Sequence, residues 1–227
     1  MLFRSNKWLL LALAGVLILG LITGCGGDNK DAAKAPSKVL RYAAGAEPET
    51  LDPRKMSGVP EHRVACQLFE GLTTHGENGV VIPGTAEKWT VSPDGKVYTF
   101  TIRSSAKWSN GDPVTAQDFE YSWKKTLDPD FAAKYAEMLY FLAGAEAYNT
   151  KKGSVDQVGV KALDDKTLQV TLADPTPYFP SLLVHSSFFP VNKKVDLANP
   201  KWASDPASFV GNGAFKMKSW THQAKIE

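Results

Sequence analysis

A continuous apolar run near the start of the chain indicates that the first residues do not belong to a globular domain. Residues 8–22 carry no charge, and they follow a short basic stretch that contains Arg4 and Lys7. The run is shorter than the roughly 20 residues that span a bilayer comfortably, and small residues rather than a basic flank follow it. We therefore interpret residues 1–24 as a cleaved signal peptide. A transmembrane anchor is the weaker alternative.

The end of this run resembles the lipobox of bacterial lipoproteins. Thr23 and Gly24 precede Cys25, and residues 26–37 are small, polar and charged. The resemblance implies that the thiol of Cys25 receives a diacylglycerol and that the protein is held at the outer face of the cytoplasmic membrane. Residues 25–37 then form a lipidated flexible tether, because their composition cannot bury a core. The alternative is an ordinary secretory peptide followed by an incidental cysteine.

Cysteine and charge content limit the remaining possibilities. If Cys25 is acylated, Cys66 has no partner, so a packed core rather than a disulfide must stabilise the fold. We expect Cys66 to be a small buried hydrophobe rather than a reactive thiol. Two of the 26 Lys and Arg residues precede Cys25, which leaves 24 basic and 24 acidic residues after it. This balance argues against nucleic-acid binding.

Alternating side chains and turn residues predict two β-hairpins. Residues 89–91 and 96–103 flank the turn 92–95, and residues 158–163 and 167–172 flank the turn 164–166. Thr115 is placed to cap a helix whose Asp118 lies at the positive end of its dipole. We also expect a strand at 39–43, a helix at 62–70 and an apolar helical stripe of Tyr135, Met138, Leu139 and Leu142. This mixture predicts a mixed α/β (α+β) fold of two lobes.

Patterns that indicate catalysis are weak. The four histidines are scattered without metal-ligand spacing, so we expect no metal and no cofactor. Residues 104–107 and 122–125 match the S-x-x-K pattern of penicillin-recognising enzymes, but no K-T-G partner exists. We predict that the protein is not an enzyme, with an exported serine hydrolase as a distant alternative.

Long ordered motifs resemble the extracellular solute-binding proteins of the peptide and nickel class. The strongest are residues 99–103 (TFTIR) and 107–119 (KWSNGDPVTAQDF). Further similar segments are 49–53 (ETLDP), 58–61 (GVPE), 68–72 (LFEGL), 159–168 (GVKALDDKTL), 177–179 (PYF), 182–185 (LLVH) and 212–215 (NGAF). The later segments are similar to the oligopeptide-binding branch in particular.

The resemblance implies a two-lobed periplasmic-binding-protein-like fold of which this chain carries a part. Residues 38–73 and 200–227 correspond to the first lobe, which is incomplete, and residues 74–199 to the smaller second domain. The C-terminal ligand-gripping lobe is expected to be absent, because family members are more than twice as long. The implied function is the capture of oligopeptides and their delivery, as a monomer, to the permease subunits of an ABC transporter. Alternatives are a dipeptide, nickel or haem binder, or a peptide-signal receptor.

The resemblance also indicates ligand-binding residues. It implies that Glu61, His62, Arg63 and Val64 lend their backbone to one edge of the peptide, as in strand addition. The alternative for Glu61 and Arg63 is an exposed pair at the start of a helix. Met138 is a further ligand-binding candidate, although packing in the core is the preferred alternative for this side chain.

Overall fold

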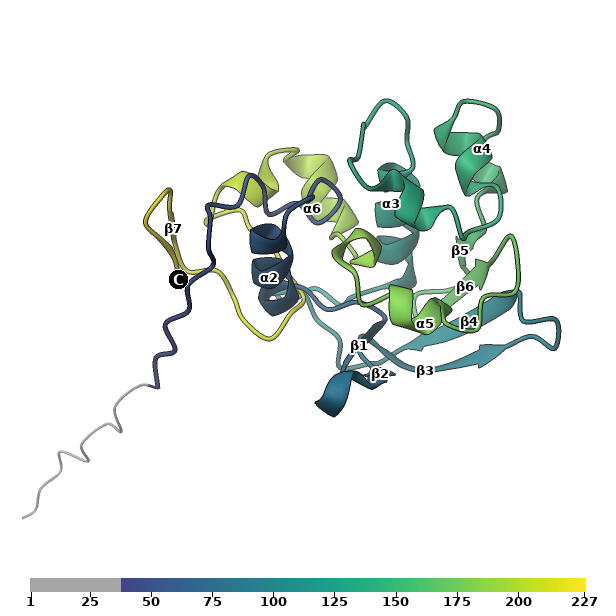
Figure 1. The fold of residues 1–227 in the computed structure, drawn as a ribbon, viewed down its shortest axis with the longest axis horizontal. Helices are drawn as coiled ribbons and strands as arrows, with labels where there is room; N and C mark the ends of the chain where they lie inside the picture. Colours follow the sequence, from purple (N-terminus) through teal and green to yellow (C-terminus); the bar gives the residue numbers. More distant parts are fainter. Residues whose placement is uncertain (1–37) are drawn as a thin grey trace, which may run out of the picture. The chain divides into compact units, whose positions relative to one another are not determined.

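The computed structural model describes residues 38–227 (Figure 1), and Ala43–Glu227 folds as one compact unit. The predicted signal peptide, Cys25 and the tether lie outside the described residues. Residues 38–43 are exposed and belong to no helix or strand, so the strand predicted at 39–43 does not form. Among the described residues, no helix has the length and apolar character needed to cross a membrane.

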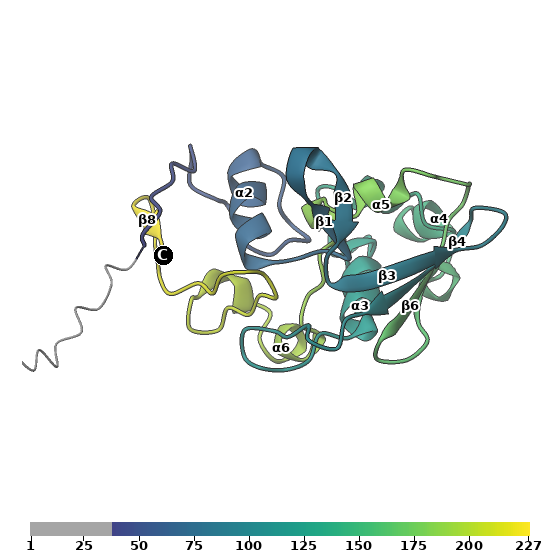
Figure 2. The same cartoon turned by 90° about the horizontal axis from the view of Figure 1, so that it is seen from below.

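The main sheet is antiparallel, with four strands in the order β3-β4-β6-β5. Figure 2 shows β3, β4 and β6 of this sheet. These strands are β3 (Ala86–Val91), β4 (Val97–Ile102), β5 (Val160–Ala162) and β6 (Thr167–Thr171). Both predicted hairpins are confirmed, and β4 pairs with β6 so that Tyr98 faces Val170 and Phe100 faces Leu168. Alternation along β4 buries Tyr98, Phe100 and Ile102 on one face of the sheet.

Helix α3 (Ala116–Thr126) packs against β5 and β6 through its apolar face. Phe119 and Trp123 are fully buried and meet edge to face, with ring centroids 6.3 Å apart. The predicted cap is confirmed, because Thr115 and Asp118 form a capping box. Asp118 also accepts hydrogen bonds from the indole of Trp108 and the backbone N–H of Lys193, so one carboxylate fixes the start of α3 to two loops.

Shorter elements complete the compact unit. The other helices are α2 (Val59–Leu68), α4 (Ala145–Asn149), α5 (Phe179–Leu182) and α6 (Lys193–Ala198). The 3₁₀ turns are η1 (Glu77–Gly79), η2 (Ala136–Leu139), η3 (Val155–Gln157), η4 (Ser186–Phe188) and η5 (Trp202–Ser204). Two small antiparallel pairs join β1 (Thr73–His75) to β2 (Val81–Pro83), and β7 (Trp220–Thr221) to β8 (Lys225–Ile226).

Two helix predictions need correction. The helix predicted at 62–70 begins three residues earlier, since Pro60 fits the first turn of α2, where a missing N–H costs nothing. The predicted helical stripe from Tyr135 to Leu142 is wrong. Only the single 3₁₀ turn η2 forms there, and Leu142 instead makes a β-bridge to Leu172.

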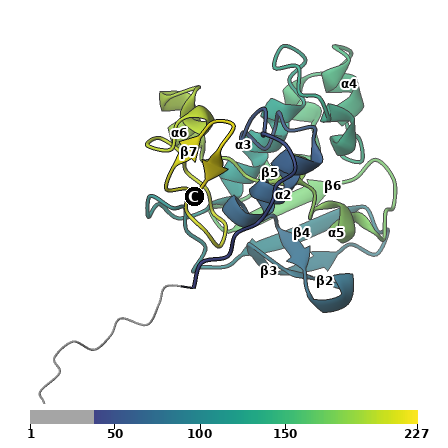
Figure 3. The ribbon, with the colours of Figure 1, turned by 60° about the vertical axis from the view of Figure 1, so that its left-hand side comes forward.

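A buried ion cluster fixes the loop that leads into α2. The guanidinium of Arg54 makes hydrogen bonds of 2.7–2.9 Å to Asp52 in the same loop and to Asp196 in α6. Asp196 also accepts hydrogen bonds from Tyr121 of α3 and from the indole of Trp202. The cluster therefore connects the loop to α3 and α6. Figure 3 shows these two helices together with α2.

Candidate functional site

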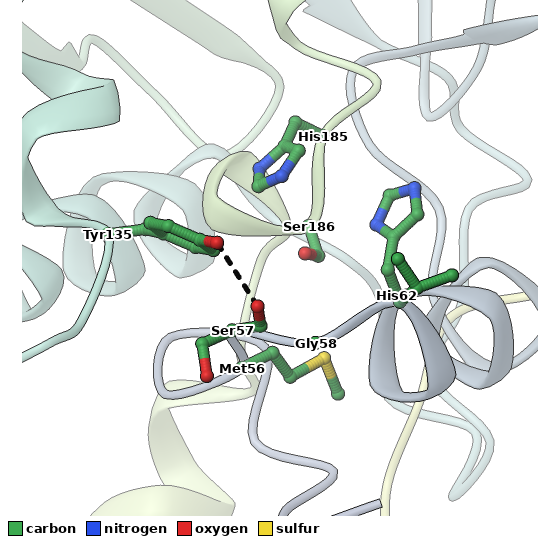
Figure 4. A pocket seen from close by; sticks show the side chains of 8 residues that line it. Met56, Ser57, Gly58, His62, Tyr135, His185 and Ser186 are labelled. Atoms are coloured by element: carbon green, nitrogen blue, oxygen red, sulfur yellow. Dashed lines mark hydrogen bonds between the residues drawn. The ribbon is translucent and has the colours of Figure 1, made fainter. Parts of the chain in front are cut away.

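A small hollow lies where α2, the segment before it and η4 meet. Its volume is about 170 Å³, and its lining consists of Met56, Ser57, Gly58, Val59, His62, Tyr135, His185 and Ser186. A pocket that encloses a drug-sized ligand usually measures roughly 300–1,000 Å³, so this hollow suits one part of a ligand, such as a single side chain. Figure 4 shows the rings of Tyr135, His62 and His185 around the open space.

Two histidines form one wall of the hollow. The rings of His62, on α2, and His185, directly before η4, stack with centroids 5.3 Å apart and an interplanar angle of 18°. Tyr135 meets His185 edge to face at 5.9 Å. Burial, and the neighbouring His75, lower the pKa of His62. Burial and the neighbouring His62 likewise lower the pKa of His185. Both rings are therefore neutral at neutral pH.

The opposite wall is the backbone of the segment that precedes α2. Gly58 has extended geometry (φ −109°, ψ 160°), and the Ser57 carbonyl accepts a 3.1 Å hydrogen bond from the Tyr135 hydroxyl. Within residues 38–227, the backbone N–H groups of Ser57 and Gly58 have no hydrogen-bond acceptor. Donors without a partner on half-buried, extended backbone are available to pair with the carbonyl groups of a bound chain.

The side chain of Glu61 contacts this wall through Gly58. Its side chain is buried, and its Oε1 accepts a 2.9 Å hydrogen bond from the backbone N–H of Glu49. Its Oε2 has no hydrogen-bond partner among the described residues and lies against Gly58, where an added Cβ would sit 2.1 Å from it. A side chain at position 58 would therefore have to displace the carboxylate of Glu61.

The residues predicted to bind ligand occupy different environments. Glu61, His62, Arg63 and Val64 all lie in α2, and the N–H of His62 already bonds the carbonyl of Gly58. Residues 61–64 are helical here and so present no strand edge in this structure; their predicted pairing with a peptide backbone stays a prediction. Only His62 lines the hollow. Whether each of the four contacts ligand stays a prediction.

The structure agrees with some of the other sequence-based expectations and disagrees with others. Glu61 is buried whereas Arg63 is exposed, so the alternative of an exposed pair holds for Arg63 alone. Met138 packs against the core and does not line the hollow. Its role in ligand binding also stays a prediction. The expectation that Cys66 is buried is wrong: its side chain is exposed, 3.5 Å from His62 Nε2.

Most of the hollow had no signal in the sequence. His62 and His185 look scattered along the chain, and only the fold stacks them.

Within residues 38–227, no group of three or more His, Cys, Asp or Glu side chains is placed to hold a metal ion. In the S-x-x-K string at residues 122–125, the hydroxyl of Ser122 donates a hydrogen bond to the Phe189 carbonyl, and Lys125 forms an ion pair with Asp128.

Comparison with known proteins identifies the class to which this fold and hollow belong. A family model described as bacterial extracellular solute-binding proteins, family 5, middle part, matches residues 80–227. The chain belongs to this family, which confirms the resemblance found in its motifs.

Several similar proteins are named as peptide-binding proteins. The oligopeptide-binding protein OppA of Bacillus subtilis is 44% identical over 98% of this chain and 42% of its own length. The dipeptide-binding protein DppE of the same organism is 48% identical over 88% of this chain and 37% of its own length. The structure of Haemophilus influenzae OppA in complex with the peptide RPPGFSPFR superposes with a TM-score of 0.78 at 43% identity, covering 81% of this chain and 36% of that one. The chain thus spans about two fifths of its relatives, and the mixed α/β fold of periplasmic binding proteins is confirmed.

Proposed function

We propose that this chain contributes the peptide-contacting N-terminal part of a solute-binding lipoprotein that captures oligopeptides and delivers them to an ABC transporter. Its relatives are named for oligopeptide binding, and one similar structure is the substrate-binding domain of an oligopeptide ABC transporter of Bacillus anthracis, with a TM-score of 0.78. We propose that the solute-binding protein is a monomer, that it delivers its ligand to the permease subunits of the transporter, and that it has no enzymatic activity. A covalent adduct with a β-lactam would contradict the last point.

The observation that carries this proposal is the wall formed by Ser57 and Gly58. Peptides of varied sequence share only their backbone, so a receptor for many of them needs backbone donors and acceptors. The free N–H groups of these two adjacent residues point to opposite sides in extended backbone, so one of them can donate to a ligand beside the hollow, which has room for one side chain. The lining contains no Asp, Glu, Lys or Arg among the described residues, so no fixed charge dictates which side chain enters.

The test replaces single peptide bonds of a bound pentaalanine by trans-alkene isosteres, which lack the carbonyl acceptor. An isostere opposite Ser57 or Gly58 leaves a desolvated N–H unpaired, which costs about 1–3 kcal/mol, or about one to two decades of affinity. Losses should alternate along the ligand, because extended pairing directs only every second residue to a given edge. Isothermal titration calorimetry measures the series.

The matched control changes one alanine to serine at each position without touching the backbone. These changes should alter affinity little. Uniformly small isostere losses combined with large serine effects would mean that side-chain pockets, rather than the backbone, carry recognition. Because DppE is named a dipeptide-binding protein, a length series from dialanine to octaalanine separates oligopeptide from dipeptide preference.

We further propose that Cys25 carries the lipid anchor and that the protein acts at the outer face of the cytoplasmic membrane. The support is the small-small-Cys sequence at the end of the apolar run. The substitution Cys25→Ser should leave the protein unlipidated, since a hydroxyl cannot form the thioether. Detergent-phase partitioning of the two proteins measures the change, with Cys66→Ser as the matched control. Equal partitioning of wild type and Cys25→Ser would refute the anchor.

A further inference from the structure

The stacked pair His62 and His185 places two titratable rings in one wall of the hollow. A charge on one ring opposes a charge on the other, because the centroids are only 5.3 Å apart. Tyr135 packs its ring edge to face against His185. The pair can therefore accept one proton far more easily than two.

Both polar groups of Ser187, the backbone N–H and the hydroxyl, lie within hydrogen-bond distance of His185 Nδ1. The backbone N–H of Ser187 donates to His185 Nδ1 at 3.3 Å, which is the side-chain cap of η4. A backbone amide is always a donor, so Nδ1 is the acceptor and the neutral ring carries its proton on Nε2. Charging this ring puts a proton on Nδ1, which removes the cap, although that N–H can donate to Ser187 Oγ, 3.1 Å away.

The groups around the pair offer no compensating negative charge. His62 faces Cys66 on its own helix and His75 on β1. Glu61, next to it, turns its carboxylate toward Gly58 and the N–H of Glu49. At the rim of the hollow, Lys134 is paired with the carboxylate of Glu49 at 2.8 Å. The side chains that line the hollow therefore carry no charge when both rings are neutral, and the carboxylate of Glu61 lies on the other side of Gly58.

We propose that His62 and His185 determine side-chain specificity by binding a ligand carboxylate together with one proton, while accepting uncharged side chains without proton uptake. A carboxylate that enters a partly buried site needs a positive partner. The proton comes from solvent and binds one imidazole, and the carboxylate then stabilises that charge. This inference rests on the proposed function and names the ligand side chains that the same site prefers at different pH values.

The test compares pentaalanine derivatives that carry one Glu or one Gln at each position in turn, at pH 7.5 and pH 5.5. Comparing Glu with Gln at the same pH cancels the titration of the peptide termini. At the position that enters the hollow, affinity for the Glu peptide relative to Gln should rise on acidification by up to about tenfold per pH unit for one proton. Calorimetry in buffers of different ionisation enthalpy should also show uptake of up to one proton for that Glu peptide alone.

Variants assign the effect to the pair. The double variant His62→Gln/His185→Gln has no imidazole in the hollow and cannot take up the proton, so it should reduce the pH dependence of the Glu-to-Gln ratio to less than about twofold. His222→Gln, which removes an exposed histidine outside the hollow, should leave the ratio and the proton uptake unchanged. If peptides bind but the ratio is independent of pH at every position, the inference fails while the proposed function stands. If no peptide binds, both fail.

Discussion

Arg54 shows how much of this molecule depends on one buried side chain. Its guanidinium lies between the carboxylates of Asp52 and Asp196, and all three side chains are less than one tenth exposed. Burial alone lowers the pKa of Arg54, but the hydrogen bonds and charges of both carboxylates outweigh it and raise the pKa. Burial by itself raises the pKa of Asp196, whereas Arg54 and Tyr121 lower it below its usual range. Arg54 and Asp196 are therefore both charged across the physiological range.

We expect Arg54→Met to destabilise the protein by about 3–5 kcal/mol, because it leaves two buried carboxylates without their cation. Urea unfolding followed by tryptophan fluorescence measures the loss. The control is Arg63→Met, which removes the same charge from an exposed position of α2 and should change stability by less than about 0.5 kcal/mol. Equal stability of the two variants would show that the cluster does not hold the loop.

Among the elements, α3 is anchored at its first turn rather than along its length. The carboxylate of Asp118 accepts hydrogen bonds from the backbone and side chain of Thr115, from Trp108 and from Lys193. Thr115 makes only the local part of this arrangement. The helix start is therefore a junction between a turn, a cap and the loop that leads into α6.

This difference predicts unequal costs for two substitutions in the same turn. Thr115→Ala removes the cap and should cost about 1 kcal/mol. Asp118→Ala also leaves the buried indole N–H of Trp108 and the N–H of Lys193 without acceptors, at about 1–3 kcal/mol for each buried group. Thermal unfolding by circular dichroism ranks the two variants. If Asp118→Ala lowers stability no more than Thr115→Ala does, Asp118 does not join the helix start to the two loops.

At the scale of the whole molecule, the histidine pair links stability to pH. Folding lowers the pKa of His62 and of His185 from the ordinary value of 6.5, mainly through burial. The unfolded chain therefore binds more protons than the folded chain as pH falls through 6.5. The stabilisation is fully present above that pH, and it is lost as pH falls toward the lowered values of the folded protein.

We expect the free energy of unfolding to decrease between pH 7.5 and pH 5.5, and the double variant His62→Gln/His185→Gln to flatten this decrease. Urea titrations at intervals of half a pH unit measure the slope. His222→Gln should keep the wild-type slope, since this exposed residue lies in the turn between β7 and β8. An unchanged slope in the double variant would assign the pH dependence to other groups.

The parts of the fold that were predictable are those whose causes are local in sequence. Both hairpins follow from alternating side chains around short turns, and the cap of α3 joins Thr115 to a residue three positions away. The stripe from Tyr135 to Leu142 misled because its helical spacing lies on a segment that turns once and then bridges to Leu172. Long-range pairing overrode the local pattern there.

The sequence by itself determined the family, the two hairpins and the capped helix, because motifs, alternation and capping are written within a few consecutive residues. Only the tertiary structure decided the hollow. His62 and His185, like Arg54 and Asp196, are separated by more than half the length of the chain, and they meet because packed elements bring them together. The start of α2 also belongs to this second group in part. Residues 61–64 wind into a helix that buries the carboxylate of Glu61, and the backbone N–H groups of Ser57 and Gly58, which have no acceptor among the described residues, lie just before it.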